Sequence, residues 1–131
     1  MAKSKAKPAT PITGPKKRPV CLSSTTTRVR TAHGNLFVTV TFEDGERPFE
    51  VFSILGKGGG CNAALLEGLS RMISLALRSG VDEKEVVEQL IGITCCPHAD
   101  EQIQSKSPVD AVAQVLRDSG GKEVVHDKEQ S

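Results

Sequence analysis

The sequence predicts an α+β fold in which a three-stranded antiparallel meander packs on one long helix, with two further helices. Through residues 25–54, apolar side chains recur at every second position, the period of a strand with one face buried. From residue 62 onward they recur at every third or fourth position, the period of a helix. A glycine-rich loop at residues 56–60 separates the two patterns, so Cys61 is expected at the start of the long helix.

The three strands are expected at residues 25–31, 35–42 and 49–54. The first is rich in threonine and valine, whose branched side chains favour a pleated surface. His33-Gly34 and Asp44-Gly45 separate the three segments, and Asp-Gly is a favoured pair for a tight hairpin. The four Phe residues lie in these strand patterns and are expected in the core. Since the chain has no Trp or Tyr, that placement leaves little aromatic surface for stacking nucleic-acid bases.

The long helix is expected over residues 62–78, with one broad apolar face on the sheet. That face would contain Leu65, Leu66, Leu69, Met72, Ile73, Ala76 and Leu77. Gly80 ends this helix. Asp82 and Glu85 form a capping-box pattern at the start of a second helix that runs to about Leu90, and Ser107 with Pro108 marks the start of a third.

The length of 131 residues fits one small domain, which we divide into three parts. Residues 1–19 are expected to form a basic disordered arm, residues 20–118 the folded domain, and residues 119–131 a polar tail. No run of apolar residues is long enough for a membrane span or a secretory signal, so we expect a cytoplasmic protein without a membrane partner. Four cysteines in such a protein indicate thiols or metal ligands more than disulfides.

Charge is divided unevenly along the chain. Residues 1–30 hold eight of the seventeen Lys and Arg residues and no Asp or Glu, so the arm is basic and the body acidic. A basic arm attracts phosphate groups without reading sequence. Two interpretations stay open: the arm contacts nucleic acid, or it folds back on the acidic body. The arm residues that would contact nucleic acid are Lys3, Lys5, Lys7, Lys16, Lys17 and Arg18.

The glycine-rich loop is a candidate anion site. Free backbone N–H groups of Gly58, Gly59 and Gly60 and the helix dipole could accept a phosphate or carboxylate, and Lys57 could add charge. The spacing matches neither a P-loop nor a dinucleotide fingerprint. The alternative is that the glycines only permit a tight turn and close packing.

A second group of candidate residues has the donor atoms that zinc prefers. Each of His33, Cys61 and Cys96 stands beside a Gly or Pro in a loop, and Cys95 and His98 flank the same turn as Cys96. Two alternatives remain: the cysteines are plain core or surface thiols, or Cys61 acts as a nucleophile with His33 as its base.

Several segments together resemble the TSCPD domain found near the C-terminus of adenosylcobalamin-dependent (class II) ribonucleotide reductases and also as a stand-alone small protein. The likeness runs from about Arg18 to Leu116 and includes TAHGNLFVTV at residues 31–40, RPFEVF at 47–52, LGKGGGC at 55–61, ISLALRSG at 73–80 and QLIGI at 89–93. The family commonly places cysteines at four points, which here read His33, Cys61, Cys96 and the cysteine-free Ser107–Asp110 segment. The resemblance therefore implies a zinc site in which His33 replaces one cysteine and Cys95 or His98 replaces another.

The resemblance does not imply independent catalysis, because the reductase reaction takes place in a large barrel that this chain is too short to form. We expect a stand-alone accessory or binding module linked to deoxyribonucleotide synthesis, with ribonucleotide reductase or another protein as partner. The rival classes are a nucleic-acid-binding or regulatory protein that uses the basic arm, and a small thiol enzyme centred on Cys61. Oligomeric state is not predicted.

Overall fold

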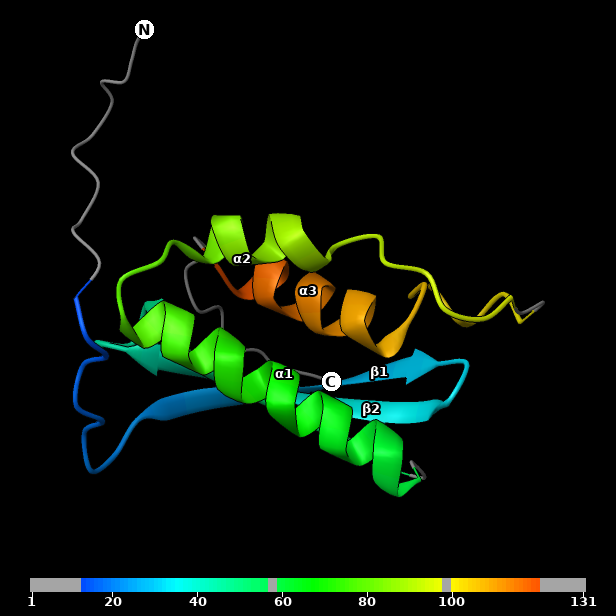
Figure 1. Ribbon diagram of the computed structural model, residues 1–131, viewed down its shortest axis with the longest axis horizontal. Coiled ribbons are helices and arrows are strands. Elements are labelled where there is room, and N and C mark those ends of the chain that lie inside the picture. The colour runs from blue at the N-terminus through cyan, green and yellow to red at the C-terminus, as the bar shows by residue number, and fades with distance from the viewer. Residues whose placement is uncertain (1–12, 57–58, 98–99, 121–131) are drawn as a thin grey trace, which may run out of the picture.

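The computed structural model describes residues 13–56, 59–97 and 100–120. In chain order these residues form β1 (Ser23–Thr31), β2 (Gly34–Glu43), β3 (Arg47–Leu55), α1 (Gly60–Arg78), α2 (Glu83–Leu90) and α3 (Pro108–Ser119). The strands make one antiparallel sheet in the order β1-β2-β3, and Figure 1 shows α1 crossing in front of it with α2 and α3 above. The predicted α+β meander, long helix and two further helices are confirmed.

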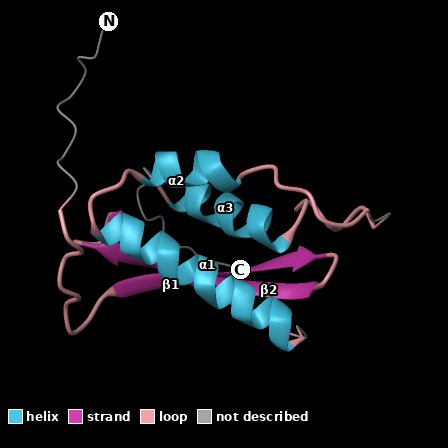
Figure 2. Ribbon diagram, in the orientation of Figure 1, coloured by secondary structure: helices cyan, strands magenta, loops and turns pink. Residues whose placement is uncertain are grey.

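The two hairpins turn where the sequence predicted (Figure 2). Asp44 and Gly45 have φ values of 56° and 76°, a left-handed backbone that Asp-Gly adopts at low cost. Gly34, at the other hairpin, has φ 113°. Because these residues fix the turns, they also fix which side chains of each strand point to the same face.

The hydrophobic core lies between one face of the sheet and the helices. Alternate residues of β2 and β3 point into it and meet α1 and α3. Its largest fully buried apolar side chains are Phe49, Leu36, Leu77, Leu116, Val38, Val40, Val51 and Val112. Burying a leucine or phenylalanine stabilises the fold by about 1.5–3 kcal/mol, so this face of the sheet supplies most of the driving force.

The helix α1 packs chiefly against β3 and runs along its outer edge. The Ser74 hydroxyl accepts a hydrogen bond from the Val51 N–H (2.9 Å) and donates one to the Val51 carbonyl (3.1 Å). Ser53 and Ser70 share a hydroxyl hydrogen bond of 2.7 Å. The free edge of β3 is therefore capped by side chains of the helix.

The prediction of a broad buried face on α1 is wrong, because the buried face is narrower than predicted. Leu66, Ile73 and Leu77 are buried, but Leu65 is 72% exposed and Met72 is exposed as well. The physical reason is that α1 lies along a single strand, so only a narrow stripe of the helix reaches the sheet.

Two of the four Phe residues are also not in the core. Phe42 and Phe49 are buried, whereas Phe37 and Phe52 point to the opposite face of the sheet and are exposed. The core described above lies on only one face, so apolar residues at the intervening strand positions stay outside it.

The shorter helices begin as predicted. The Asp82 side chain accepts a hydrogen bond from the Lys84 N–H, and the Ser107 hydroxyl accepts one from the Asp110 N–H. Among the described residues, no helix combines the length and the hydrophobicity that crossing a bilayer requires.

Candidate metal centre

His33 occupies the tight turn between β1 and β2. The Thr31 hydroxyl accepts a hydrogen bond from the His33 N–H (3.0 Å) and donates one to the Gly34 carbonyl (2.7 Å). Thr31 is itself buried, so the turn is anchored to the domain. These bonds hold the backbone that carries the His33 ring at the end of the hairpin.

Cys95 and Cys96 lie on the connection between α2 and α3. The Cys95 N–H donates to the Lys106 carbonyl (3.0 Å), which joins the two arms of this connection. The Ser105 hydroxyl donates to the Arg30 carbonyl (3.1 Å) on β1. The cysteines are thus tied to the strand that leads into the His33 turn.

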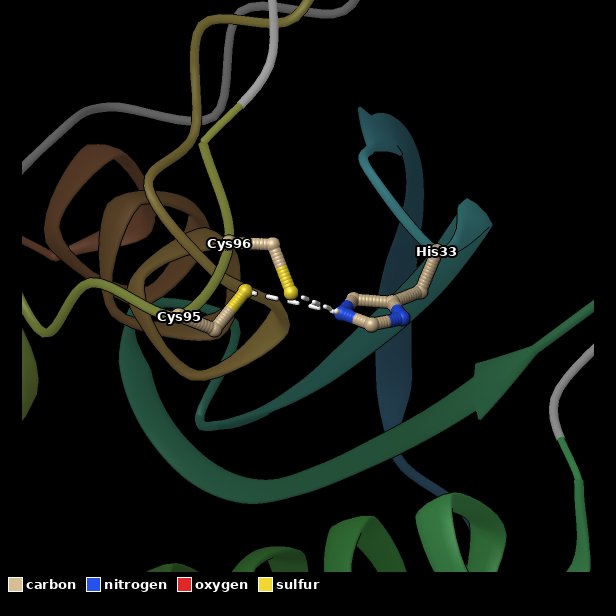
Figure 3. A group of neighbouring side chains, drawn as sticks. All are labelled: His33, Cys95 and Cys96. Atoms are coloured by element: carbon tan, nitrogen blue, oxygen red, sulfur yellow. Dashed lines mark hydrogen bonds between the residues drawn. The ribbon is translucent and has the colours of Figure 1, made fainter.

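These two loops bring three donor atoms together, as Figure 3 shows. The His33 Nε2 atom lies 3.5 Å from the Cys95 Sγ and 3.4 Å from the Cys96 Sγ, and all three atoms are within 4.8 Å of one another. In a tetrahedral zinc site with Zn–S of about 2.3 Å and Zn–N of about 2.0–2.1 Å, a sulfur and a nitrogen stand about 3.6 Å apart. The observed spacing therefore fits two thiolates and an imidazole around one ion.

The two sulfurs influence each other's protonation. A side-chain hydrogen bond from Cys95 and the negative charge that Cys95 can carry raise the pKa of the Cys96 thiol above its ordinary value. Two adjacent thiolates repel one another, so ionisation of both thiols is unfavourable without a cation. A bound divalent cation would offset that repulsion.

The remaining predicted ligands divide into two cases. Cys61 lies in the first turn of α1, where the sequence placed it, but it is exposed and does not belong to the His33, Cys95 and Cys96 group. His98 lies outside the described residues. The structure thus brings together three of the five predicted ligands, and it places His33 beside Cys95 and Cys96 instead of Cys61.

The other candidate sites are described only in part. Lys57 and Gly58 of the candidate anion site lie outside the described residues, and Gly59 precedes α1 with no side-chain cap. A Cβ atom added at Gly59 or Gly60 would meet no other atom within 4 Å, so close packing does not require glycine at either place.

The described part of the basic segment contacts the body. Lys16 Nζ lies 2.8 Å from a Glu43 carboxylate oxygen, and Arg18 Nε lies 3.0 Å from Glu50. Lys3, Lys5 and Lys7 lie outside the described residues. Where it is described, the segment therefore contacts acidic side chains of the sheet, as one of the two open interpretations expected.

Asp110 supports the cysteine loop in a way that the sequence did not indicate. Its carboxylate accepts hydrogen bonds from the Gly92 N–H (2.6 Å), the Lys106 N–H (2.8 Å) and the Gln114 amide (2.8 Å). Its side chain is almost wholly buried. Asp110 thereby clamps both ends of the connection that carries Cys95 and Cys96. The sequence signal was an acid three residues after Ser107, which by itself indicates only a helix cap.

One of three comparisons with known proteins gives a match. A family model described as the TSCPD domain matches residues 6–119, which is most of the chain. Comparisons with curated proteins and with solved structures give no significant match.

Proposed function

This chain belongs to the family of TSCPD domains, and from that membership we propose that it is a zinc-binding accessory module related to the C-terminal domain of ribonucleotide reductases. The observation that carries the proposal is the convergence of His33, Cys95 and Cys96. A site with two thiolates and one imidazole binds zinc in preference to magnesium, calcium or manganese.

The role of the metal is structural in this proposal. Within the described residues, zinc would join the β1–β2 turn to the α2–α3 connection, two segments that also meet through Ser105 and Arg30. Such a crosslink stabilises a small domain whose core is modest. A structural zinc site takes four protein ligands, and we propose His98, which lies outside the described residues two positions after Cys96, as the fourth.

We propose that the partner is a ribonucleotide reductase subunit and that the module acts in the cytoplasm, where free thiols persist. The module itself carries out no chemistry in this proposal. His33 was the predicted base for Cys61. In the described residues its ring faces Cys95 and Cys96 instead.

Elemental analysis tests the metal site. Full-length protein purified in a reducing buffer without added metal should contain about one zinc per chain. His33→Ala and Cys96→Ser should each reduce the bound zinc at least about 10-fold, because each removes a direct ligand. Cys21→Ser and Cys61→Ser are matched controls on exposed thiols outside the group and should leave the zinc content unchanged. Zinc that survives His33→Ala, or that disappears in Cys61→Ser, would contradict the assignment.

Metal loading should also release protons. Cysteine thiols are mainly protonated at pH 7, and Cys95 raises the pKa of Cys96 further. Zinc binds thiolates, so its addition to the metal-free protein should release about two protons per ion, and affinity should fall as the pH is lowered. A pH indicator in weakly buffered solution measures this release. Release unchanged in the Cys96→Ser variant would show that the protons come from other groups.

A partner assay tests the second part of the proposal. Co-purification of tagged full-length protein from its native host should recover a ribonucleotide reductase subunit. Recovery by the wild type and loss by Cys96→Ser would connect the partner to the metal site. Zinc binding without any reductase in the eluate would separate the metal site from the proposed pathway.

A further inference from the structure

The face of the sheet opposite the core forms three neighbouring rows of side chains. The strand register sets Thr26, Thr39 and Phe52 in one row and Arg28, Phe37 and Ile54 in the next. The third row contains Arg30 and Asn35, with Gly56 hydrogen-bonded to the Asn35 carbonyl. The core and the helices that line it lie on the other face of the sheet.

Large apolar side chains lie exposed on this face. Phe37 is 39% exposed, Phe52 47% and Ile54 68%. Phe37 pairs directly with Ile54, so Phe52 is its diagonal neighbour on the next strand, about 7–8 Å away along the sheet. That distance suits two successive bases of an extended single strand, each stacked on one ring.

The charged groups of this face favour a polyanion. Arg28 is exposed beside Phe37, and Arg30 follows it along β1. Glu50, on the same face, is paired with Arg18 (3.0 Å), and Asp100 is paired with Arg30 (3.5 Å), so Arg28 is the arginine of the three rows without an ion pair among the described residues. Arginines alongside stacked aromatic rings are the combination that binds a nucleic-acid backbone and its bases together.

The face leads into a hollow at the His33 end of the sheet. Its volume is about 490 Å³, and its lining includes Arg30, Asn35, Phe37, Asp100 and Ile103. This volume lies within the range of pockets that hold small organic groups. The side-chain amide of Asn35 and the Arg30 guanidinium can donate hydrogen bonds to an inserted base or phosphate.

We propose that this open face of the sheet binds single-stranded nucleic acid, with bases stacked on Phe37 and Phe52 and a phosphate near Arg28. This surface belongs to the folded domain and is distinct from the basic N-terminal arm. A duplex is excluded as the preferred ligand because its stacked bases cannot reach the rings. The proposal is independent of the zinc site.

Fluorescence anisotropy with a labelled 12-nucleotide oligo(dT) and the full-length protein tests the proposal. The wild type should bind the single strand and prefer it to the matching oligo(dT)·oligo(dA) duplex. Phe37→Ala and Phe52→Ala should each weaken binding roughly 10- to 100-fold, the cost of losing one stacked base. Arg28→Ala should reduce the slope of log affinity against log salt by about 0.7, the loss of one phosphate contact to a single strand.

Three controls make the outcome decisive. Leu65→Ala and Met72→Ala remove apolar side chains on α1 that are more exposed than Phe37 and Phe52, and they should not change affinity. Melting temperatures of the variants at Arg28, Phe37, Phe52, Leu65 and Met72 should stay close to that of the wild type, because these side chains are exposed. Replacing Lys3, Lys5 and Lys7 by Gln in the full chain should leave the dependence on Phe37 intact.

Each of the other results would overturn the proposal. The first is that the single strand does not bind at low salt. The second is that the duplex binds with equal affinity. The third is that binding depends on the three lysines but not on Phe37 or Phe52. A fourth is a change in the sedimentation of the free protein in the Phe variants without nucleic-acid binding, which would identify a self-association surface.

Discussion

Leu77→Asp should unfold the domain. Leu77 is 1% exposed and belongs to the stripe of α1 that packs against β3. A carboxylate at that position would have no partner in the core, and burying an unpaired charge costs several kcal/mol in addition to the lost apolar contact. A small domain is stable by about 5–15 kcal/mol, so one such change removes most of it. Loss of the far-UV circular dichroism signal at 25 °C would measure the effect.

Leu65→Asp is the matched control for this prediction. It places the same substitution on the same helix, but Leu65 is 72% exposed. The charged side chain can remain in water, so the melting temperature should stay within about 4 °C of wild type. Equal destabilisation by both variants would show that the outer side of α1 is also covered in solution.

Asp110→Ala should be the most destabilising loss of a polar side chain. It removes the carboxylate that accepts part-buried hydrogen bonds from the Gly92 and Lys106 N–H groups, at about 1–3 kcal/mol for each bond. The summed cost of roughly 2–6 kcal/mol corresponds to a fall in melting temperature of about 8–25 °C. The two ends of the connection that carries Cys95 and Cys96 would no longer be held together by Asp110, so zinc affinity should also decrease.

Asp118→Ala is the control, because Asp118 is an exposed acid near the end of the same helix. Its melting temperature should differ from wild type by no more than about 2 °C. Differential scanning calorimetry with and without zinc would separate the two consequences of Asp110→Ala. If the variant melted at the wild-type temperature, the carboxylate would not be the clamp described above.

The periodicity of the chain was sufficient to predict the order of elements. Alternation in the strands and the Asp44-Gly45 turn defined the meander, and caps such as Ser107 defined the start of a helix. These signals are local, because each depends on neighbouring residues whose spacing sets which face they share. The width of the buried face on α1 could not be predicted, since it depends on how the helix lies against β3.

The candidate site could be predicted only as a list of residue types. His33 and the Cys95-Cys96 pair are more than 60 positions apart, and their meeting depends on Asp110 and Ser105, which position the loop. Nothing in the sequence spacing separates Cys61 from the three residues that converge. In the same way, the alternation in β2 and β3 groups Phe37 and Phe52 on one face, but it does not indicate which face the helices leave uncovered.

The capping of β3 by α1 has a consequence for how the sheet can be extended. The Ser74 hydroxyl is hydrogen-bonded to both the N–H and the carbonyl of Val51, so a new strand cannot pair with this residue. The opposite edge belongs to β1, which in the described structure pairs only with β2 and is exposed along most of its length. The sheet can therefore grow in one direction only. The two exposed arginines on β1, Arg28 and Arg30, oppose uncontrolled strand addition there, as charged side chains do on natural edge strands.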